Sequence, residues 1–193
     1  MYEYISGKVI EKSPVHIVIE NNGLGYFINI SLNTFTAIGD NKEATLFIYE
    51  HIREDVFSLF GFFDNGEREV FRQLISVSGI GANTARMMLS SLPPDEVISA
   101  IRTENIPVLT SIKGIGNKTA QRIIIDLKDK VGKLEGDEKL FALKDNTNRE
   151  EALSALVMLG FNKNASQKAI DKILSKEPNS KVEQIVKMAL KIL

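Results

Sequence analysis

The chain has 193 residues, with 24 basic and 25 acidic side chains and no cysteine. The lack of cysteine excludes a disulfide-bonded fold and a thiolate metal site, and it is typical of a reducing compartment. No apolar run approaches the ~20 residues that span a bilayer, and the first residues lack a signal-peptide pattern. We therefore expect a cytoplasmic protein without a membrane partner, built as one large domain or two to three small ones.

The net charge of −1 conceals an uneven distribution along the chain. Residues 1–62 carry 4 basic and 8 acidic side chains, residues 63–134 carry 10 and 8, and residues 135–193 carry 10 and 9. Charges are screened over ~10 Å, so a local excess decides whether phosphate binds. Such an excess occurs within 109–133, where Asp126 and Asp129 are outnumbered by Lys113, Lys118, Arg122, Lys128, Lys130 and Lys133.

Residues 1–63 are predicted to form five short strands, because they contain runs of β-branched and aromatic residues separated by turn-forming sequences. Five strands in this length suit a small closed barrel of the OB type. The expected strands are Tyr4–Glu11, Val15–Glu20, Tyr26–Leu32, Ala44–Ile52 and Val56–Phe62.

An acidic pair, Glu54 and Asp55, lies in the turn between the last two predicted strands. The simpler interpretation is a solvated turn without a role. The alternative is that two carboxylates beside a phosphate track repel it, by about 1–3 kcal/mol per pair at ~4–6 Å. The residues by themselves leave both interpretations open.

Residues 64–134 contain one pattern twice. Ser76–Ala85 returns 35 positions later as Ser111–Ala120, and Leu74–Leu92 aligned with Leu109–Leu127 gives 8 identities in 19 positions. In both copies an apolar helix end is followed by a Gly-Ile-Gly turn and by a new helix. This order is typical of a helix-hairpin-helix element, so we predict a tandem pair.

Each hairpin is predicted to bind a phosphate through its backbone. Glycine permits positive φ and a close approach by another backbone. The helix that follows begins with unpaired N–H groups at the positive end of its dipole, which is a ready anion site. Such contacts position a nucleic acid but carry little base information. The candidate glycines are Gly79, Gly81, Gly114 and Gly116.

Other glycine-rich sites fit these residues less well. A P-loop requires glycine followed directly by Lys-Ser/Thr, whereas Asn117 separates Gly116 from Lys118. A dinucleotide-binding fingerprint requires a third glycine and a preceding strand, and the sequence has neither at this place. For a single copy, a helix–helix turn without a ligand is an equally good interpretation. Two copies in register favour phosphate binding.

The last part of the chain is predicted to be a separate helical module. Residues 135–146 lose helical periodicity and predict a flexible linker, and residues 147–193 predict three short helices with a thin core. Modules of this kind more often bind a partner helix than perform chemistry. Capping boxes predict two of the helix starts, at Thr147 with Glu150 and at Ser180 with Glu183.

We predict no catalytic residue, metal ligand or cofactor. His16 and His51 are the only histidines, and neither has a nucleophile or a second ligand nearby in the sequence. The acidic residues do not form the cluster that a two-metal nuclease requires. Lys118 and Asp126 are the nearest candidates for a glycosylase or lyase, the main alternative function, yet both are expected on the exposed face of a helix that binds DNA backbone.

The order of barrel, tandem helix-hairpin-helix and terminal three-helix module resembles the RuvA family of Holliday junction branch migration subunits. The resemblance covers essentially the whole chain. Leu159-Gly160-Phe161 is also similar to the turn after the first helix of ubiquitin-associated-like domains. The passages that carry the family resemblance are Arg53-Glu54-Asp55, Leu59-Phe60-Gly61-Phe62, the two Gly-Ile-Gly repeats and Leu156–Phe161.

The resemblance implies a non-catalytic subunit in recombination, DNA repair and the SOS response. RuvA-like proteins form a homotetramer, single or as a stacked pair, that holds a four-way DNA junction open and square. The third domain would recruit a RuvB-type hexameric ATPase, and a RuvC-type junction resolvase would act on the same junction. It also implies site residues: Asn83, Lys118 and Arg122 beside the hairpin glycines, Glu54 and Asp55 as an acidic pin that separates strands, and Leu156, Leu159, Phe161 and Ile170 for the motor.

The first hairpin departs from the family pattern. Ala82-Asn83 stands where the family commonly has proline and lysine. Asn83 can donate a hydrogen bond but lacks the charge, so the second hairpin is predicted to carry more of the salt-dependent affinity. Besides the glycosylase, an adaptor with purely structural hairpins stays an alternative, and loss of DNA binding in a folded Gly116→Asp variant would argue against it.

Overall fold

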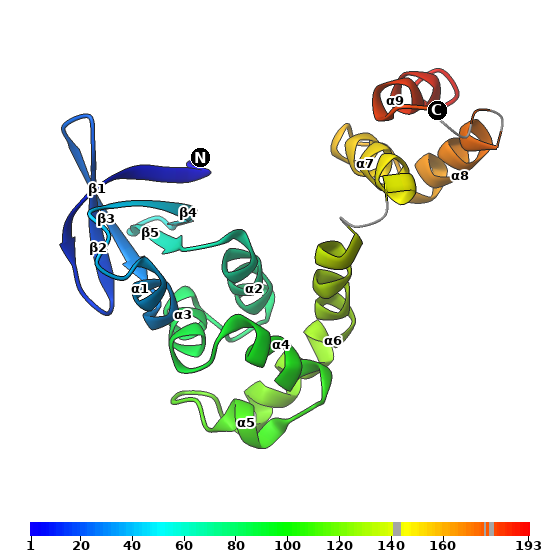
Figure 1. The fold of residues 1–193 in the computed structure, drawn as a ribbon. Helices are drawn as coiled ribbons and strands as arrows, with labels where there is room; N and C mark the ends of the chain where they lie inside the picture. The colour runs from blue at the N-terminus through cyan, green and yellow to red at the C-terminus, as the bar shows by residue number, and fades with distance from the viewer. Residues whose placement is uncertain (141–143, 176, 178–179) are drawn as a thin grey trace. The chain divides into compact units, whose positions relative to one another are not determined.

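The structure is a computed structural model that describes residues 1–140, 144–175, 177 and 180–193 (Figure 1). The chain divides into two compact units, Met1–Gly132 and Lys133–Leu193. The first contains a closed β-barrel followed by helices, and the second contains a helical module. The predicted fold class, α+β with an N-terminal barrel, a central helical hairpin pair and a terminal helical module, is confirmed.

The barrel closes five strands in the order β1-β2-β3-β5-β4, with β3 and β5 parallel and the other pairs antiparallel. Inward-facing aliphatic side chains such as Ile17, Ile28 and Leu46 form its core because alternate residues of a strand point to opposite faces. The strands are β1 Tyr4–Lys12, β2 His16–Asn21, β3 Leu24–Ile30, β4 Glu43–Ile52 and β5 Phe57–Phe62. All five predicted strands are confirmed, with ends shifted by one or two residues.

The sequence did not predict the helix α1, Leu32–Ile38, between β3 and β4. Its seven residues include two threonines, which have low helix propensity, so periodicity gave no signal. A signal was present at its start, because the hydroxyl of Ser31 accepts a hydrogen bond from the backbone N–H of Thr34. The predicted strand to Leu32 therefore ends at Ile30, and Leu32 belongs to the helix.

The helical part of the first unit contains the two predicted hairpins. Phe71 of α2 packs against the rings of Tyr49, Phe60 and Phe62 at centroid distances of 5.3, 5.4 and 4.8 Å, which joins the helix to the barrel. Pro94 and Pro107 stand in the first turns of two helices, where a missing N–H costs nothing. The helices are α2 Asn65–Ser76, α3 Ala82–Ser91, α4 Pro94–Arg102, α5 Ile106–Thr110 and α6 Asn117–Leu140.

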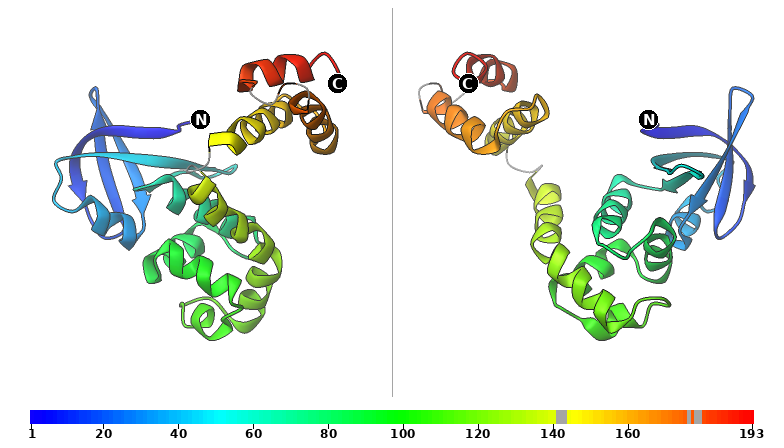
Figure 2. Two further views of the ribbon diagram at one scale, coloured as in Figure 1. Left: turned by 45° about the vertical axis from the view of Figure 1, so that its right-hand side comes forward. Right: turned by 180° about the vertical axis from the view of Figure 1, so that it is seen from behind.

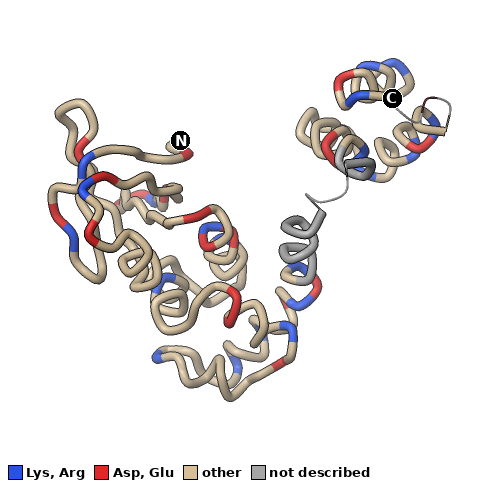
Figure 3. The backbone as a smooth tube through the Cα atoms, viewed as in Figure 1, with Lys and Arg blue, Asp and Glu red and all other residues tan. Residues whose placement is uncertain are grey.

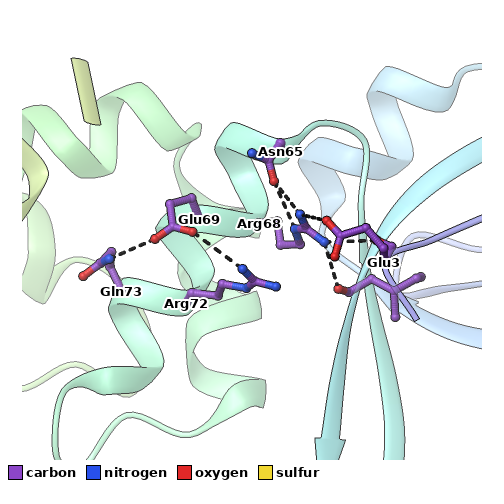
Figure 4. Close-up of polar contacts among 7 residues, drawn as sticks. Glu3, Asn65, Arg68, Glu69, Arg72 and Gln73 are labelled. Carbon is purple, nitrogen blue, oxygen red and sulfur yellow. Dashed lines mark hydrogen bonds and ion pairs between the residues drawn. The ribbon is translucent and has the colours of Figure 1, made fainter. Parts of the chain in front are cut away.

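A buried arginine also fixes α2 to the barrel (Figure 4). The Arg68 guanidinium pairs with the Glu3 carboxylate and donates to the Glu3 carbonyl at 3.0 Å, while Asn65 accepts a further hydrogen bond at 2.7 Å. On the same helix Glu69 forms an ion pair with Arg72 and accepts a hydrogen bond from the Gln73 side chain. Figure 2 shows α2 beside the barrel in both views. Because the Arg68 side chain is 5% exposed and its guanidinium nitrogens are all hydrogen-bonded, this contact restricts the position of the helix.

A second buried group, Glu67, connects α2 to α1. The hydroxyls of Ser31 and Thr34 donate to its carboxylate, the latter at 2.5 Å. Burial raises the pKa of Glu67, although these hydrogen bonds oppose the shift. On α3, Arg86 donates to the carbonyl of Val15 at 2.8 Å. The hairpin helices are therefore anchored to the barrel at several points.

The second unit packs three helices, α7 Lys144–Met158, α8 Lys163–Leu174 and α9 Val182–Ala189, around a small apolar core. The number of helices is as predicted, but two starts differ. α7 begins before Thr147, and the N-cap of α9 is Lys181 instead of Ser180, with its N–H donating to Gln184 at 3.1 Å.

The segment predicted as a linker, 135–146, is helical at both ends, since α6 continues to Leu140 and α7 starts at Lys144. Residues 141–143 lie outside the described residues. The backbone of 135–140 and 144–146 is therefore helical, although the sequence shows no helical periodicity there. The role of 135–146 as a flexible connection stays a prediction.

Candidate nucleic-acid interface

The two hairpins have the same backbone geometry. Gly79 and Gly114 have φ of 95° and 91°, a region that side chains with a Cβ rarely adopt. The isoleucines between the glycines, Ile80 and Ile115, are buried. They anchor each turn to its helices. Repetition in sequence is thus repetition in structure.

Hydrogen bonds repeat with the same offset of 35 residues. Three backbone pairs in each hairpin fix the helix end, the turn and the start of the next helix. In the first they are Val77 to Leu74 at 3.1 Å, Ile80 to Val77 at 3.0 Å and Ala85 to Gly81 at 3.0 Å. In the second they are Ile112 to Leu109 at 3.3 Å, Ile115 to Ile112 at 3.0 Å and Ala120 to Gly116 at 2.9 Å.

The start of each following helix is open for an anion. Gly81 is the N-cap of α3 and provides no side chain to occupy the first N–H groups, and Gly116 precedes α6 in the same way. A Cβ placed on either glycine would meet no protein atom within 4 Å. Asn83, in the first turn of α3, is exposed. Both hairpins therefore present backbone donors and a positive dipole end to unoccupied space.

An open depression of about 510 Å³ lies between the first hairpin and the exposed side of α6. Arg122 lines it and donates to the carbonyl of Ser78 at 3.4 Å. Lys118 is exposed on the same lining. Figure 3 shows basic residues along this part of the chain. The depression is lined by Ser78, Gly79, Lys118, Thr119, Gln121, Arg122, Ile125 and Asp126.

Sequence reasoning did not single out Ser78, Thr119, Gln121 or Ile125. A signal existed for Ile125, because it follows Lys118 and Arg122 at the spacing of one helix face. No local signal brings Ser78 to Arg122, since 44 residues separate them. The structure therefore joins the two copies of the repeat into one surface. The sequence predicted them only as two separate phosphate-binding sites.

One lysine of the basic run is not free for phosphate. Lys128 pairs with Glu104, a residue outside the segment over which the local charge excess was counted. The hydrogen bond with Glu104 raises the pKa of Lys128. Lys118 and Arg122, nearer the start of α6, are the basic residues that line the depression.

The two candidates for glycosylase chemistry, Lys118 and Asp126, are both exposed and both line the open depression. Their placement on the exposed side of a hairpin helix agrees with the expectation from sequence. In the part of the chain that the structure describes, no group of three His, Cys, Asp or Glu side chains could hold a metal ion. Within the described residues, no helix has the length and apolar character needed to cross a bilayer.

Glu54 and Asp55 form the two-residue loop of the β4–β5 hairpin. Arg53 and Val56 flank them and exchange backbone hydrogen bonds of 2.8 and 3.4 Å. Both acidic residues are exposed, and among the described residues neither has an ion-pair partner. Two exposed carboxylates therefore stand at the tip of this hairpin without an ion-pair partner among the described residues, at the position that the sequence predicted.

The structure divides the four residues predicted to bind a motor. Leu156 and Ile170 are completely buried in the core of the helical module, so their side chains stabilise the module and do not form its surface. Leu159 is 60% exposed, and Phe161 is partly buried against that core. The apolar spacing that suggested these residues is the signal of a helix core, and it does not distinguish core from docking surface.

Comparison with known proteins adds family matches over most of the chain. Residues 1–61 match the RuvA N-terminal domain, 71–129 the SAM-like helix-hairpin-helix tandem, and 147–193 the RuvA C-terminal domain. The chain is 53% identical over 191 residues to a protein of Christiangramia forsetii and 52% identical over 201 residues to one of Bacteroides fragilis, with 99% of each chain covered. A Cytophaga hutchinsonii protein is 43% identical over 198 residues, with both chains fully covered. All three relatives are named Holliday junction branch migration complex subunit RuvA.

Proposed function

The chain belongs to the RuvA family, and we propose that it is a DNA-binding subunit that recognises four-way junctions and holds them open for branch migration. The observation that carries this proposal is the matched geometry of the two hairpins. Two phosphate sites held at a fixed separation fit a regular duplex backbone, and a junction arm provides one.

The hairpins would supply most of the affinity. Backbone N–H groups at the starts of α3 and α6 would bind phosphate oxygens, and Lys118 and Arg122 would neutralise charge beside the second hairpin. The link from Arg122 to Ser78 supports one continuous surface. Such contacts are insensitive to base sequence, as branch migration through changing sequence requires.

The acidic hairpin would act at the branch point. Glu54 and Asp55 have no ion-pair partner among the described residues and lie on a two-residue loop that backbone hydrogen bonds between Arg53 and Val56 close. Carboxylates in that position would repel the phosphates of strands that cross the centre. The repulsion, about 1–3 kcal/mol per pair at ~4–6 Å, would help to separate strands as they exchange partners.

The proposal extends to assembly and partners, for which the resemblance to the RuvA family is the support. A homotetramer, single or stacked as a pair, would place four hairpin pairs under the four arms. The second unit would recruit a RuvB-type hexameric ATPase through exposed residues such as Leu159, while the chain itself performs no catalysis. A RuvC-type resolvase would share the junction. The participation of Phe161 in motor binding stays a prediction.

The test is an electrophoretic shift with an immobile four-way junction and a linear duplex of equal arm length, at fixed salt. A preference for the junction of 100-fold, about 2.7 kcal/mol, is expected. A Gly116→Asp variant, checked for folding by circular dichroism, should lose binding to both DNAs. Equal affinity of the wild type for both DNAs would refute junction recognition, and covalent trapping on abasic duplex would establish the lyase instead.

A further inference from the structure

The acidic hairpin carries an exposed apolar pair beside its carboxylates. Ile52 ends β4, Phe57 begins β5, and the two are cross-strand partners. Their exposed fractions are 64% and 61%. Large apolar side chains at the tip of a hairpin are costly in water, and the phosphate repulsion assigned to Glu54 and Asp55 does not account for them.

The pair forms one platform. Ile48 and Leu59 point into the barrel, and Ile52 and Phe57 lie an even number of residues from them, so all four share one face of the hairpin. Arg53 and Val56 exchange the hydrogen bonds next to the loop. Ile52 and Phe57, the next cross-strand pair, are therefore a non-hydrogen-bonded pair, in which the opposed side chains lie closest.

The barrel core does not cover this platform. Ile48 is 1% exposed. Ile52, four residues further along the same face of β4, is among the most exposed apolar residues of the barrel. The left view of Figure 2 shows β4 extending past the rest of the barrel. The apolar row that fills the barrel therefore continues onto a projecting hairpin, where it can meet another molecule.

We propose that Ile52 and Phe57 form a stacking platform for a nucleobase at the branch point of the junction. The inference rests on the proposed function. The carboxylates of Glu54 and Asp55 repel phosphates, so the uncharged face of a base approaches this hairpin more readily than the backbone does. A base pair at the branch point lacks a stacked neighbour on one side, and an aromatic ring stacks on any base.

The two parts of the hairpin then act on different parts of DNA. Glu54 and Asp55 keep the sugar-phosphate backbone away, and Phe57 replaces the stacking that a base pair loses when its arm separates. Because a ring accepts every base, the contact survives each step of migration. The platform would hold the end of an arm open without reading its sequence.

The experiment compares Phe57→Ala, Phe57→Leu and Phe57→Tyr in the full chain, with a synthetic four-way junction and a linear duplex as probes. Junction affinity should fall about 10-fold in Phe57→Ala, in the range measured when aromatic stacking on a base is removed. Phe57→Tyr should retain affinity, whereas Phe57→Leu should lose it, because leucine keeps the apolar volume but not the ring. Duplex affinity should stay unchanged in all three.

Val56→Ala is the matched control, since this adjacent residue points to the other face of the hairpin; its junction affinity should be that of the wild type. Wild-type affinity of Phe57→Ala for the junction would overturn the platform while leaving junction recognition intact. A smaller assembly by analytical ultracentrifugation of Phe57→Ala would overturn it too, because the face would then be a contact between copies. A wild type that does not prefer the junction would refute the proposed function, and this inference with it.

Discussion

Replacing Lys118 with alanine should reduce the salt dependence of DNA binding, whereas replacing Lys128 should not. Both lysines are exposed on α6, ten residues apart. Lys118 lines the depression beside the first hairpin, while Lys128 pairs with Glu104. The comparison removes the same charge from the same helix and changes only its surroundings.

The magnitude follows from counterion release. Each phosphate neutralised on duplex DNA contributes about 0.9 to the slope of log K against log salt. Lys118→Ala should lower the slope by about 0.9 for each subunit bound, and by about 3.6 if a tetramer engages four arms. Between 50 and 200 mM salt, one such contact changes affinity by about 3.5-fold.

The assay is fluorescence anisotropy with a labelled four-way junction over a series of salt concentrations, with stoichiometry measured by sedimentation. Lys128→Ala should retain the wild-type slope, because its ammonium group is held by Glu104 away from phosphate. An unchanged slope for Lys118→Ala would remove Lys118 from the phosphate contacts. Equal slope losses in both variants would show that α6 acts through its total charge and would refute the reasoning from local contacts.

Three further results are expected. Gly114→Ala should lower the free energy of unfolding by about 1–2 kcal/mol in urea titration, because Gly114 has a positive φ. Gly116→Ala should leave the free energy of unfolding unchanged but weaken DNA binding in an electrophoretic shift assay. The reverse pattern would contradict the geometry assigned to the two glycines. Burial raises the pKa of Glu67, so the unfolded chain loses this proton first and stability should fall as pH rises from the ordinary glutamate range through the raised value. Glu67→Gln should flatten that part of the melting-temperature profile, and an unchanged profile would refute the assignment. Combined Glu54→Gln and Asp55→Asn should tighten junction binding in the anisotropy assay without affecting duplex, and weaker binding would show that the carboxylates attract the junction.

Much of the fold could be predicted because its signals are local. A few contiguous residues specify each hairpin turn: a glycine at positive φ, a buried isoleucine such as Ile80, and a helix start without a capping side chain. The strands likewise follow from alternation and from turn residues. Helix α1 escaped prediction because its stability comes from packing and from the Ser31 cap, and its seven residues show no periodicity.

The candidate site was predicted less completely, because apolar spacing identifies a helix face but not what covers it. Leu156 and Leu159 looked alike in the sequence, yet the first is buried in the module core and the second is exposed. The same limit applies to charge. Lys118 and Lys128 belong to one basic run, and only the fold places Glu104 beside the second.

The sequence by itself determined that two helix-hairpin-helix elements exist, since each depends on a few neighbouring residues and the repeat makes the pattern recognisable. The tertiary structure decided how they combine. It brings Ser78 to Arg122 across 44 positions, and it pairs Lys128 with Glu104. It also leaves Ile52 and Phe57 exposed, whereas Ile48 and Leu59 on the same strands are buried in the barrel. Contacts between residues distant in sequence depend on how the elements pack, and no short segment of the chain contains that information.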